Sequence, residues 1–248
     1  MFDKKTRNMI ILGLGIGLFT GTVSFFLTKN ISFNIQSSLN IENNSSNQRS
    51  QNILLGNNAK NFEVNRNRGF EYKQKALEEN NQSQRIYYWN EAITAWKDAL
   101  SLNTNDTIIL NELGYGYYYL MNLTQDNNGA LDYFNVGIDY FSKVLNIDTN
   151  FYWSLFGIGY LYADFAERTS ETVGYLRESI NYMDKGLVYN GNYDYIHLSK
   201  GWSLFKLGNL TNNKQYYMLA IESFNNVLKF DTNNQYAKDG IRYCNEML

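Results

Sequence analysis

One spacing pattern occurs four times between residues 92 and 233 and constrains the fold more than any other feature. In each copy a small residue is followed four residues later by a large apolar one, seven residues later by a small or medium one, and twelve residues later by a polar turn. The leading pairs are Ala92 with Trp96, Gly137 with Phe141, Ser179 with Met183, and Ala220 with Phe224. Offsets of three and four residues share one helix face. The pattern therefore predicts repeated helices that approach a neighbour at the small residue and fill the adjacent space with the large one.

A second helix is expected after each of the first three turns. A glycine stands ten residues after each turn position, at Gly114, Gly159 and Gly201, and Tyr117, Tyr162 and Leu204 follow three residues later. The turn positions Thr104, Thr149, Gly191 and Thr232 are 45, 42 and 41 residues apart. Each repeat is thus predicted to be a pair of antiparallel helices, because a short turn joins them.

These offsets resemble the tetratricopeptide repeat (TPR), in which L-G-x2-Y precedes A-x3-F. The matching segments include Leu113-Gly114-Tyr115-Gly116-Tyr117 and Ala92…Trp96…Ala99. The resemblance implies an all-α fold over residues 61–248, a right-handed TPR-like α-solenoid of about four helix pairs. HEAT repeats have a period nearer to this one, but the small and large offsets favour TPR. Because the family's period is 34 residues, the extra residues are expected between the two helices of a repeat, as at 122–129, 167–172 and 209–214.

The segment from Gln235 onward begins a further helix without a partner. Terminal helices of repeat arrays usually cap the core with a polar outer face. Lys238, Asp239, Arg242 and Glu246 are suited to such a face. A C-terminal capping helix is therefore expected.

The N-terminus predicts a membrane anchor. Residues 9–27 carry no charge and are long enough to cross a bilayer as a helix. The basic residues of the short segment 1–8 place the N-terminus in the cytoplasm and the repeats on the opposite side of the membrane. A cleaved signal peptide is the alternative. Residues 28–60 are rich in Asn, Ser and Gln, which predicts a flexible polar linker.

A glycine stripe marks one face of the predicted anchor. Gly13, Gly17 and Gly21 are spaced four residues apart, a pattern that lets two membrane helices approach closely. Glycine is also common in membrane helices in general. The stripe therefore has two explanations. Either two anchors pack together and form a homo-oligomer, or the glycines only reflect the usual composition of membrane helices.

Composition argues against several functions. The net charge of −2 gives no basic face for nucleic acid. The only histidine, His197, and the only cysteine, Cys244, cannot form a common zinc site or, without a nucleophile motif, a catalytic triad. Carboxylates such as Glu112 and Asp164 are expected to be helix-surface charges. No catalytic residue, metal or cofactor is predicted, and the chain is expected not to be an enzyme.

Because there is no proline, turns must be marked by Asn, Asp and Gly.

The resemblance also implies a partner-binding groove, because the first helices of successive TPR repeats line a concave surface that takes peptides or helices. The positions that correspond here are Asn111, Tyr115, Tyr118, Trp153, Phe156, Tyr160, Leu198, Trp202 and Phe205. This set is aromatic and nearly uncharged, so an apolar or amphipathic helix is a better partner than an acidic C-terminus. The alternative is that these side chains pack against the chain's own helices.

The function expected from these features is a membrane-tethered scaffold or adaptor for protein–protein interaction. It would bind a partner through the aromatic groove, in the assembly or chaperoning of a membrane or envelope complex. The alternative is a structural membrane protein that self-associates through the glycine stripe of its anchor.

Overall fold

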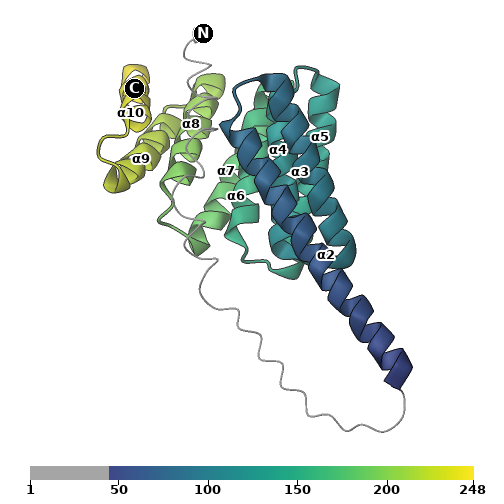
Figure 1. The fold of residues 1–248 in the computed structure, drawn as a ribbon. Coiled ribbons are helices and arrows are strands. Elements are labelled where there is room, and N and C mark those ends of the chain that lie inside the picture. Colours follow the sequence, from purple (N-terminus) through teal and green to yellow (C-terminus); the bar gives the residue numbers. More distant parts are fainter. Residues whose placement is uncertain (1–44) are drawn as a thin grey trace. The chain divides into compact units, whose positions relative to one another are not determined.

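The computed structural model describes the backbone of residues 45–248 and the side chains from residue 55 onward. The chain divides into two compact units, Met1–Lys60 and Asn61–Leu248. In the described part there are nine α-helices and one short 3-10 helix (Figure 1). They are α2 (Ser45–Glu78), α3 (Gln82–Leu102), α4 (Thr107–Leu123), α5 (Asn127–Ile147), α6 (Tyr152–Phe165), η1 (Ala166–Arg168), α7 (Thr172–Tyr189), α8 (Asp194–Thr211), α9 (Lys214–Phe230) and α10 (Gln235–Met247).

The expected membrane anchor, residues 9–27, and its glycines Gly13, Gly17 and Gly21 lie outside the described residues. None of the described helices is both long and apolar enough to cross a membrane. Residues 45–60, which were assigned to the linker, belong to α2 in the structure.

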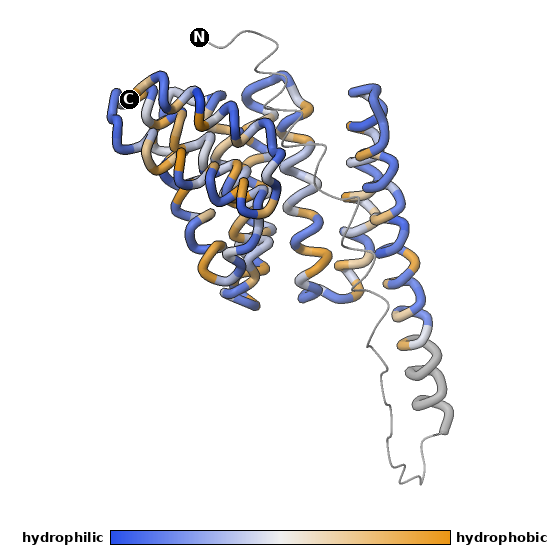
Figure 2. Tube along the Cα trace, turned by 90° about the vertical axis from the view of Figure 1, so that its left-hand side faces the viewer, coloured by the Kyte–Doolittle hydropathy of each residue, from blue (hydrophilic) through white to orange (hydrophobic). Residues whose placement is uncertain are grey.

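Consecutive helices of the second unit pack as antiparallel pairs. Helix α4 packs on α5, α6 on α7, and α8 on α9, and each pair packs in turn on the next. The first helices of successive pairs also touch directly, α4 with α6, α6 with α8, and α8 with α10. Apolar and polar positions alternate along the helices (Figure 2), as expected of elements that bury one face.

The small and large residues of the sequence pattern meet as predicted. A Cβ atom on Gly114 would lie 2.6 Å from Cε1 of Phe141, and one on Gly201 would lie 2.5 Å from Cε1 of Phe224. Gly159 has the same relation to Met183. Each glycine therefore admits the large side chain of its partner helix, which is fully buried in all three cases.

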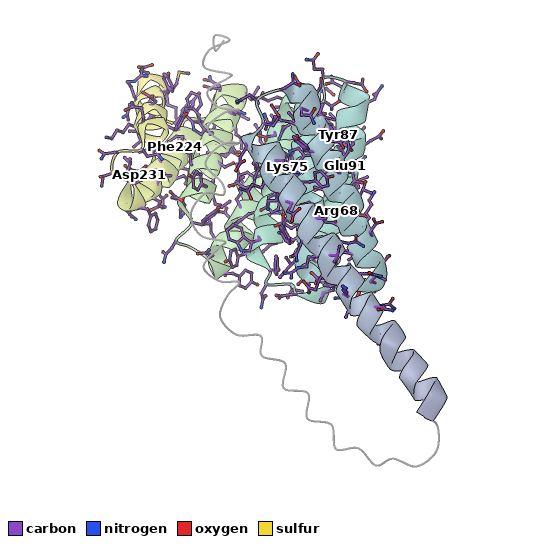
Figure 3. All side chains as sticks on the ribbon, viewed as in Figure 1. Arg68, Lys75, Tyr87, Glu91, Phe224 and Asp231 are labelled. Atoms are coloured by element: carbon purple, nitrogen blue, oxygen red, sulfur yellow. The ribbon has the colours of Figure 1, made fainter. Side chains whose placement is uncertain are left out.

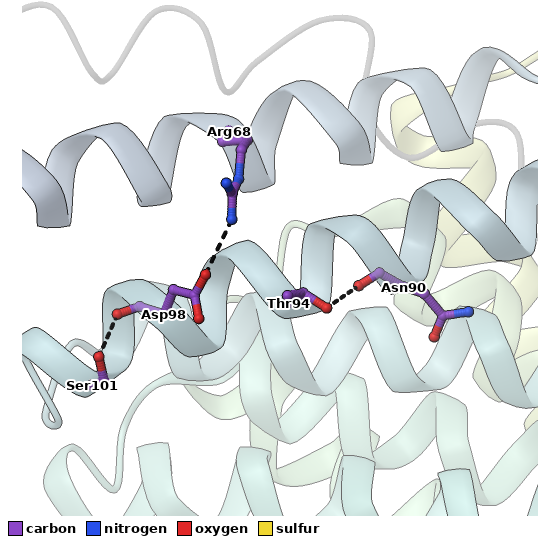
Figure 4. A network of polar contacts seen from close by, with 5 residues as sticks. All are labelled: Arg68, Asn90, Thr94, Asp98 and Ser101. Carbon is purple, nitrogen blue, oxygen red and sulfur yellow. Dashed lines mark hydrogen bonds and ion pairs between the residues drawn. The ribbon is translucent and has the colours of Figure 1, made fainter.

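The first repeat follows the same rule through α2 and α3. Gly69 lies against the indole of Trp96, and the ring of Phe70 packs edge-on against the same indole at 5.6 Å. An exposed ion pair joins the two helices as well: the Arg68 guanidinium lies 3.1 Å from the Asp98 carboxylate (Figure 4). Since an exposed ion pair contributes about 1 kcal/mol at most, the indole packing is the main link between these helices.

Asparagine and aspartate mark the helix starts, as the absence of proline led us to expect. The side chain of the residue before the helix accepts a backbone N–H bond at five starts. These residues are Asn81, Asp106, Asp126, Asn213 and Asn234. Such a cap satisfies a donor that the helix leaves unpaired. At the other end, Asn212 ends α8 in a left-handed conformation with φ 51°.

The extra residues of the long repeats lengthen helices rather than loops, which corrects the expected insertions. Only residues 124–126 separate α4 from α5, and only 212–213 separate α8 from α9. The remaining residues of 122–129 and 209–214 are helical. The segment 167–172 does lie between two helices, partly as η1. Asparagine-rich turns read as loops in a sequence, but Asn and Asp here act as caps within short connections.

Helix α10 caps the end of the described array. Its residues Ala237, Gly240 and Cys244 are buried against the preceding pair. Lys238, Arg242 and Glu246 are exposed, whereas Asp239 is half-buried and bonded to Arg242. The polar outer face that was expected is therefore present.

Candidate functional site

The nine sequence-predicted groove residues come from three neighbouring first helices, α4, α6 and α8. We call the surface they follow the first-helix face, defined by Asn111, Tyr115, Tyr118, Trp153, Phe156, Tyr160, Leu198, Trp202 and Phe205. The structure joins its α4 and α6 members directly. The Tyr115 hydroxyl donates to the backbone carbonyl of Trp153 at 2.9 Å. The rings of Tyr118 and Tyr160 lie 6.0 Å apart.

The α8 members of the face pack mainly toward the C-terminal helices. The ring of Trp202 meets that of Phe224 on α9 at 5.2 Å, and Phe205 meets Tyr217 at 5.8 Å. Both rings also lie near Tyr243 on α10. This end of the face thus serves the hydrophobic core of the last repeat.

Burial divides the first-helix face. Eight of the nine side chains are no more than 8% exposed, and Trp153 alone is half-buried. Most residues of the first-helix face therefore contribute to packing between helices, which is the alternative that the sequence left open. A partner-binding role for these residues stays a prediction, with Trp153 as its most accessible member.

Sequence reasoning missed an aromatic cluster around Trp153. Tyr152, Tyr193 and Tyr195 are half-buried like Trp153. The Trp153 ring lies 5.0 Å from the Tyr152 ring and 5.0 Å from the Tyr193 ring. These residues stand at the starts of α6 and α8, directly after the turns of two consecutive repeats. Aromatic residues at that shared position were the signal available in the sequence.

Asp164, near the C-terminal end of α6, is not the surface charge that was expected. Its carboxylate is half-buried, and its Oδ2 accepts hydrogen bonds from the Tyr118 hydroxyl at 2.8 Å and from Asn122 Nδ2 at 3.1 Å. Burial raises the pKa of this carboxyl above its ordinary value, and these two hydrogen bonds with the positive charge of Lys206 oppose the rise only in part. The carboxylate thus joins two first helices, α4 and α6.

Glu112 on α4 is likewise an interior residue, which corrects its assignment to the helix surface. It is 8% exposed, and its Oε2 lies 2.6 Å from the ammonium of Lys73 on α2, which is also 8% exposed. A buried charge requires such a partner. The pair links the first helices of the first two repeats.

The hydroxyl of Tyr160 has no hydrogen-bond partner among the described residues, although the side chain is only 2% exposed. Burial raises its pKa well above the ordinary value, and Tyr193, Tyr115, Tyr119 and Asp164 raise it further. A buried polar group without a partner is uncommon in folded proteins. The Tyr160 hydroxyl is therefore a point on the first-helix face where a buried polar group lacks a hydrogen bond.

Comparison with known proteins identifies the architecture. The crystal structure of the MamA protein matches with a TM-score of 0.55 and 15% identity, over 76% of this chain and 83% of that one. The chain has a TPR-like fold. A second structure, MamA MSR-1 C2, matches with a TM-score of 0.47 and 17% identity, over 72% and 86% of the two chains. A thermophilic TPR protein of Thermus thermophilus matches with a TM-score of 0.41 and 12% identity, over 72% and 99%. No protein-family model and no curated protein sequence matches the chain.

His197 and Cys244 are the residues of the TPR-like domain best suited to bind a metal or act as a nucleophile, and both have contacts that serve the fold. His197 Nε2 lies 3.0 Å from the carbonyl oxygen of Gly191, across the turn before α8. Cys244 is buried, and burial raises the pKa of its thiol to about 12. In the described part of the chain no group of three or more His, Cys, Asp or Glu residues is placed to hold a metal ion.

Proposed function

We propose that this chain is a scaffold that binds a protein partner through the first-helix face of its TPR-like domain. The observation that carries the proposal is the half-buried aromatic cluster that Trp153, a member of that face, forms with Tyr152, Tyr193 and Tyr195. Tryptophan and tyrosine dominate the residues that contribute most to protein–protein binding. An apolar or amphipathic helix would bury these rings and leave its own polar side in water.

The geometry of the cluster favours a role in binding over a role in folding alone. Tyr193 already has a ring stacked against it on one side, since it lies 5.7 Å from Phe156 at an interplanar angle of 11°. The Trp153 ring meets Tyr193 edge-on, at 81°. The rings of Trp153 and Tyr193 are thus roughly perpendicular, and the buried Phe156 holds Tyr193 in place. Large rings that are already fixed lose little conformational entropy when a partner binds.

The N-terminal run 9–27 would tether this scaffold to a membrane, with segment 1–8 in the cytoplasm and the repeats on the other side. Its length and lack of charge support the tether. A scaffold held in this way would serve the assembly or chaperoning of a membrane or envelope complex. Extraction of isolated membranes with alkaline carbonate tests the tether: the chain should stay in the membrane pellet, and release into the supernatant would contradict it. Protease protection in intact cells tests the orientation.

The binding role is tested by capture of the native partner with the wild-type chain and with Trp153→Ala. Loss of a central tryptophan contact costs about 2 kcal/mol or more, roughly a thirtyfold loss of affinity. The control is Tyr87→Ala, because Tyr87 (labelled in Figure 3) is 49% exposed and belongs to α3, not to the helices α4, α6 and α8 that carry the first-helix face. The proposal predicts that Trp153→Ala loses the captured protein and that Tyr87→Ala retains it. Equal capture by both variants would contradict it.

A further inference from the structure

The Asp164 carboxylate uses one of its two oxygens within the TPR-like domain. Both of its hydrogen-bond donors, Tyr118 and Asn122, bind Oδ2. Among the described residues no ammonium or guanidinium forms an ion pair with Asp164. A carboxylate can accept about four hydrogen bonds through its two oxygens. Asp164 is half-buried and its Oδ1 is not among the buried unpaired atoms of the described residues, so Oδ1 keeps the capacity to accept a further donor.

The lysine whose charge acts on Asp164 is held by a different partner. Lys206 on α8 lowers the pKa of Asp164 through its charge, but its Nζ lies 2.6 Å from Oε1 of Glu167. Arg168 donates to the backbone carbonyl of Thr124 at 3.0 Å. The local charges are therefore two carboxylates and two cations, and Asp164 is the carboxylate without a bonded cation.

The unpaired hydroxyl of Tyr160 lies on the same helix, one turn before Asp164. The two residues share the face of α6 that meets α4, because Tyr118 contacts both: its hydroxyl binds Asp164, and its ring lies 6.0 Å from the Tyr160 ring. A carboxylate oxygen, a phenol oxygen and two electron-rich rings thus occur together at one place on the first-helix face.

We propose that Asp164, together with Tyr118 and Tyr160, receives a lysine or arginine side chain of the bound partner. The cation would form a charge-assisted hydrogen bond with Oδ1 of Asp164, next to the rings of Tyr118 and Tyr160, which are only 3% and 2% exposed. The Tyr160 oxygen is buried in this structure, so it would accept from the cation only after its side chain moves. The site lies eleven residues along α6 from Trp153, roughly 16 Å at 1.5 Å per residue. An amphipathic helix that covers Trp153 with an apolar side chain can therefore reach it with a basic one. This inference rests on the proposed function, since it names the chemistry of the same partner.

Selection of peptides tests the inference without knowledge of the natural partner. A phage library of random linear peptides is selected on the immobilised full-length chain. The consensus peptide is then synthesised with its basic residue and with glutamine in that place. The affinity of both peptides is measured by fluorescence anisotropy for the wild type, Asp164→Asn, Tyr160→Phe and the control Asp139→Asn. Asp139 is an exposed carboxylate on α5 that pairs with Lys143.

We expect a lysine or arginine at one fixed position of the selected peptides. Asp164→Asn should weaken the basic peptide about tenfold or more, as the loss of a hydrogen bond between charged groups does, and Tyr160→Phe should weaken it less. The glutamine peptide should bind wild type and Asp164→Asn alike, and Asp139→Asn should behave as the wild type. Thermal unfolding should show both site variants to be at least as stable as the wild type, so that unfolding does not explain the loss.

The contrary results separate this inference from the proposed function. Selected peptides without a fixed basic residue, or equal affinity of wild type and Asp164→Asn for the basic peptide, would overturn the inference and leave the scaffold role intact. Failure to select any peptide would contradict the scaffold role and the inference with it. Self-association that Asp164→Asn abolishes, measured by sedimentation, would assign the site to a second copy of this chain and overturn its assignment to a separate partner.

Discussion

Gly114 on α4 lies directly against the ring of Phe141 on α5, so closely that a Cβ atom on the glycine would be 2.6 Å from Cε1 of the ring. The same ring also contacts Gly157 on α6. Phe141 is thus held between two glycines from successive first helices. The repeated small and large residues of the sequence therefore represent a steric fit among three helices.

Substitution of Gly114 by alanine should destabilise the domain. The added methyl group would force the Phe141 ring to move, and overpacking of this kind costs about 1–3 kcal/mol. Alanine offsets up to about 1 kcal/mol of this through its higher helix propensity. We expect a net loss of about 1–2 kcal/mol in the free energy of unfolding, measured in urea. The matched control is Gly174→Ala on α7, where no atom lies within 4 Å of the new Cβ; this variant should be as stable as the wild type or more so. A Gly114→Ala variant no less stable than Gly174→Ala would refute the steric account.

The buried pair of Lys73 and Glu112 makes a second prediction. Lys73→Met removes the cation and leaves Glu112 charged and buried, which costs about 3–5 kcal/mol. The double variant Lys73→Met, Glu112→Met removes both charges and should recover most of that stability, because apolar residues of similar volume replace buried ion pairs well. Urea unfolding of the two variants checks this. If the double variant were as unstable as the single one, the ion pair would not be the cause.

The pH dependence of stability is predicted at Asp164. Its native pKa is raised above the ordinary value of 3.8, so the folded state holds this proton more tightly than the unfolded state. The wild type therefore loses stability at this site as pH rises through the interval between 3.8 and the native pKa. Asp164→Asn keeps an oxygen acceptor for Tyr118 and does not titrate. Its stability relative to the wild type should increase across that interval and be constant at neutral pH. Unfolding curves of both proteins between acid and neutral pH measure the difference, and a relative stability that falls with rising pH would contradict the raised pKa.

Cys244 should report unfolding of the C-terminal cap. Its side chain is fully buried on α10, and the pKa of its thiol is raised to about 12. Because the thiolate is the reactive form, a disulfide reagent such as dithionitrobenzoate should react slowly with the native protein at neutral pH. In urea the reaction should become fast as the cap is lost. Rapid reaction of the native chain would show that α10 does not stay packed.

The helix pairs could be predicted from the sequence because the close packing of helices requires small and large residues at fixed spacings. The contacts of Gly114 with Phe141 and of Gly201 with Phe224 follow from fixed offsets that sequence alone displays. The position of the caps was also accessible, since Asn and Asp have a known preference for helix starts. The lengthening of the helices could not be predicted, because an asparagine-rich stretch is compatible with either a helix cap or a loop.

The candidate site was harder to predict, because helical periodicity does not say what covers a face. Tyr115 and Trp153 both fit the groove positions, yet one is buried and the other half-buried. The sequence predicts Glu112 and Asp164 to be surface charges, since carboxylates are usually exposed. Their partners, Lys73 and Tyr118, lie more than one helix away in the chain. Only the packing of α2, α4 and α6 brings these groups together.

The central claim, that a partner lies on the first-helix face beside Trp153, is tested most directly by photo-crosslinking in intact cells. Benzoylphenylalanine would replace Trp153 in one variant and Tyr140 in another. Tyr140 is also half-buried, but it lies on the second helix α5, where its ring stacks on that of Tyr117 at 5.7 Å. We predict a light-dependent adduct with a discrete partner from position 153 and none from position 140. An adduct from position 140 alone, or no adduct from 153, would contradict the claim.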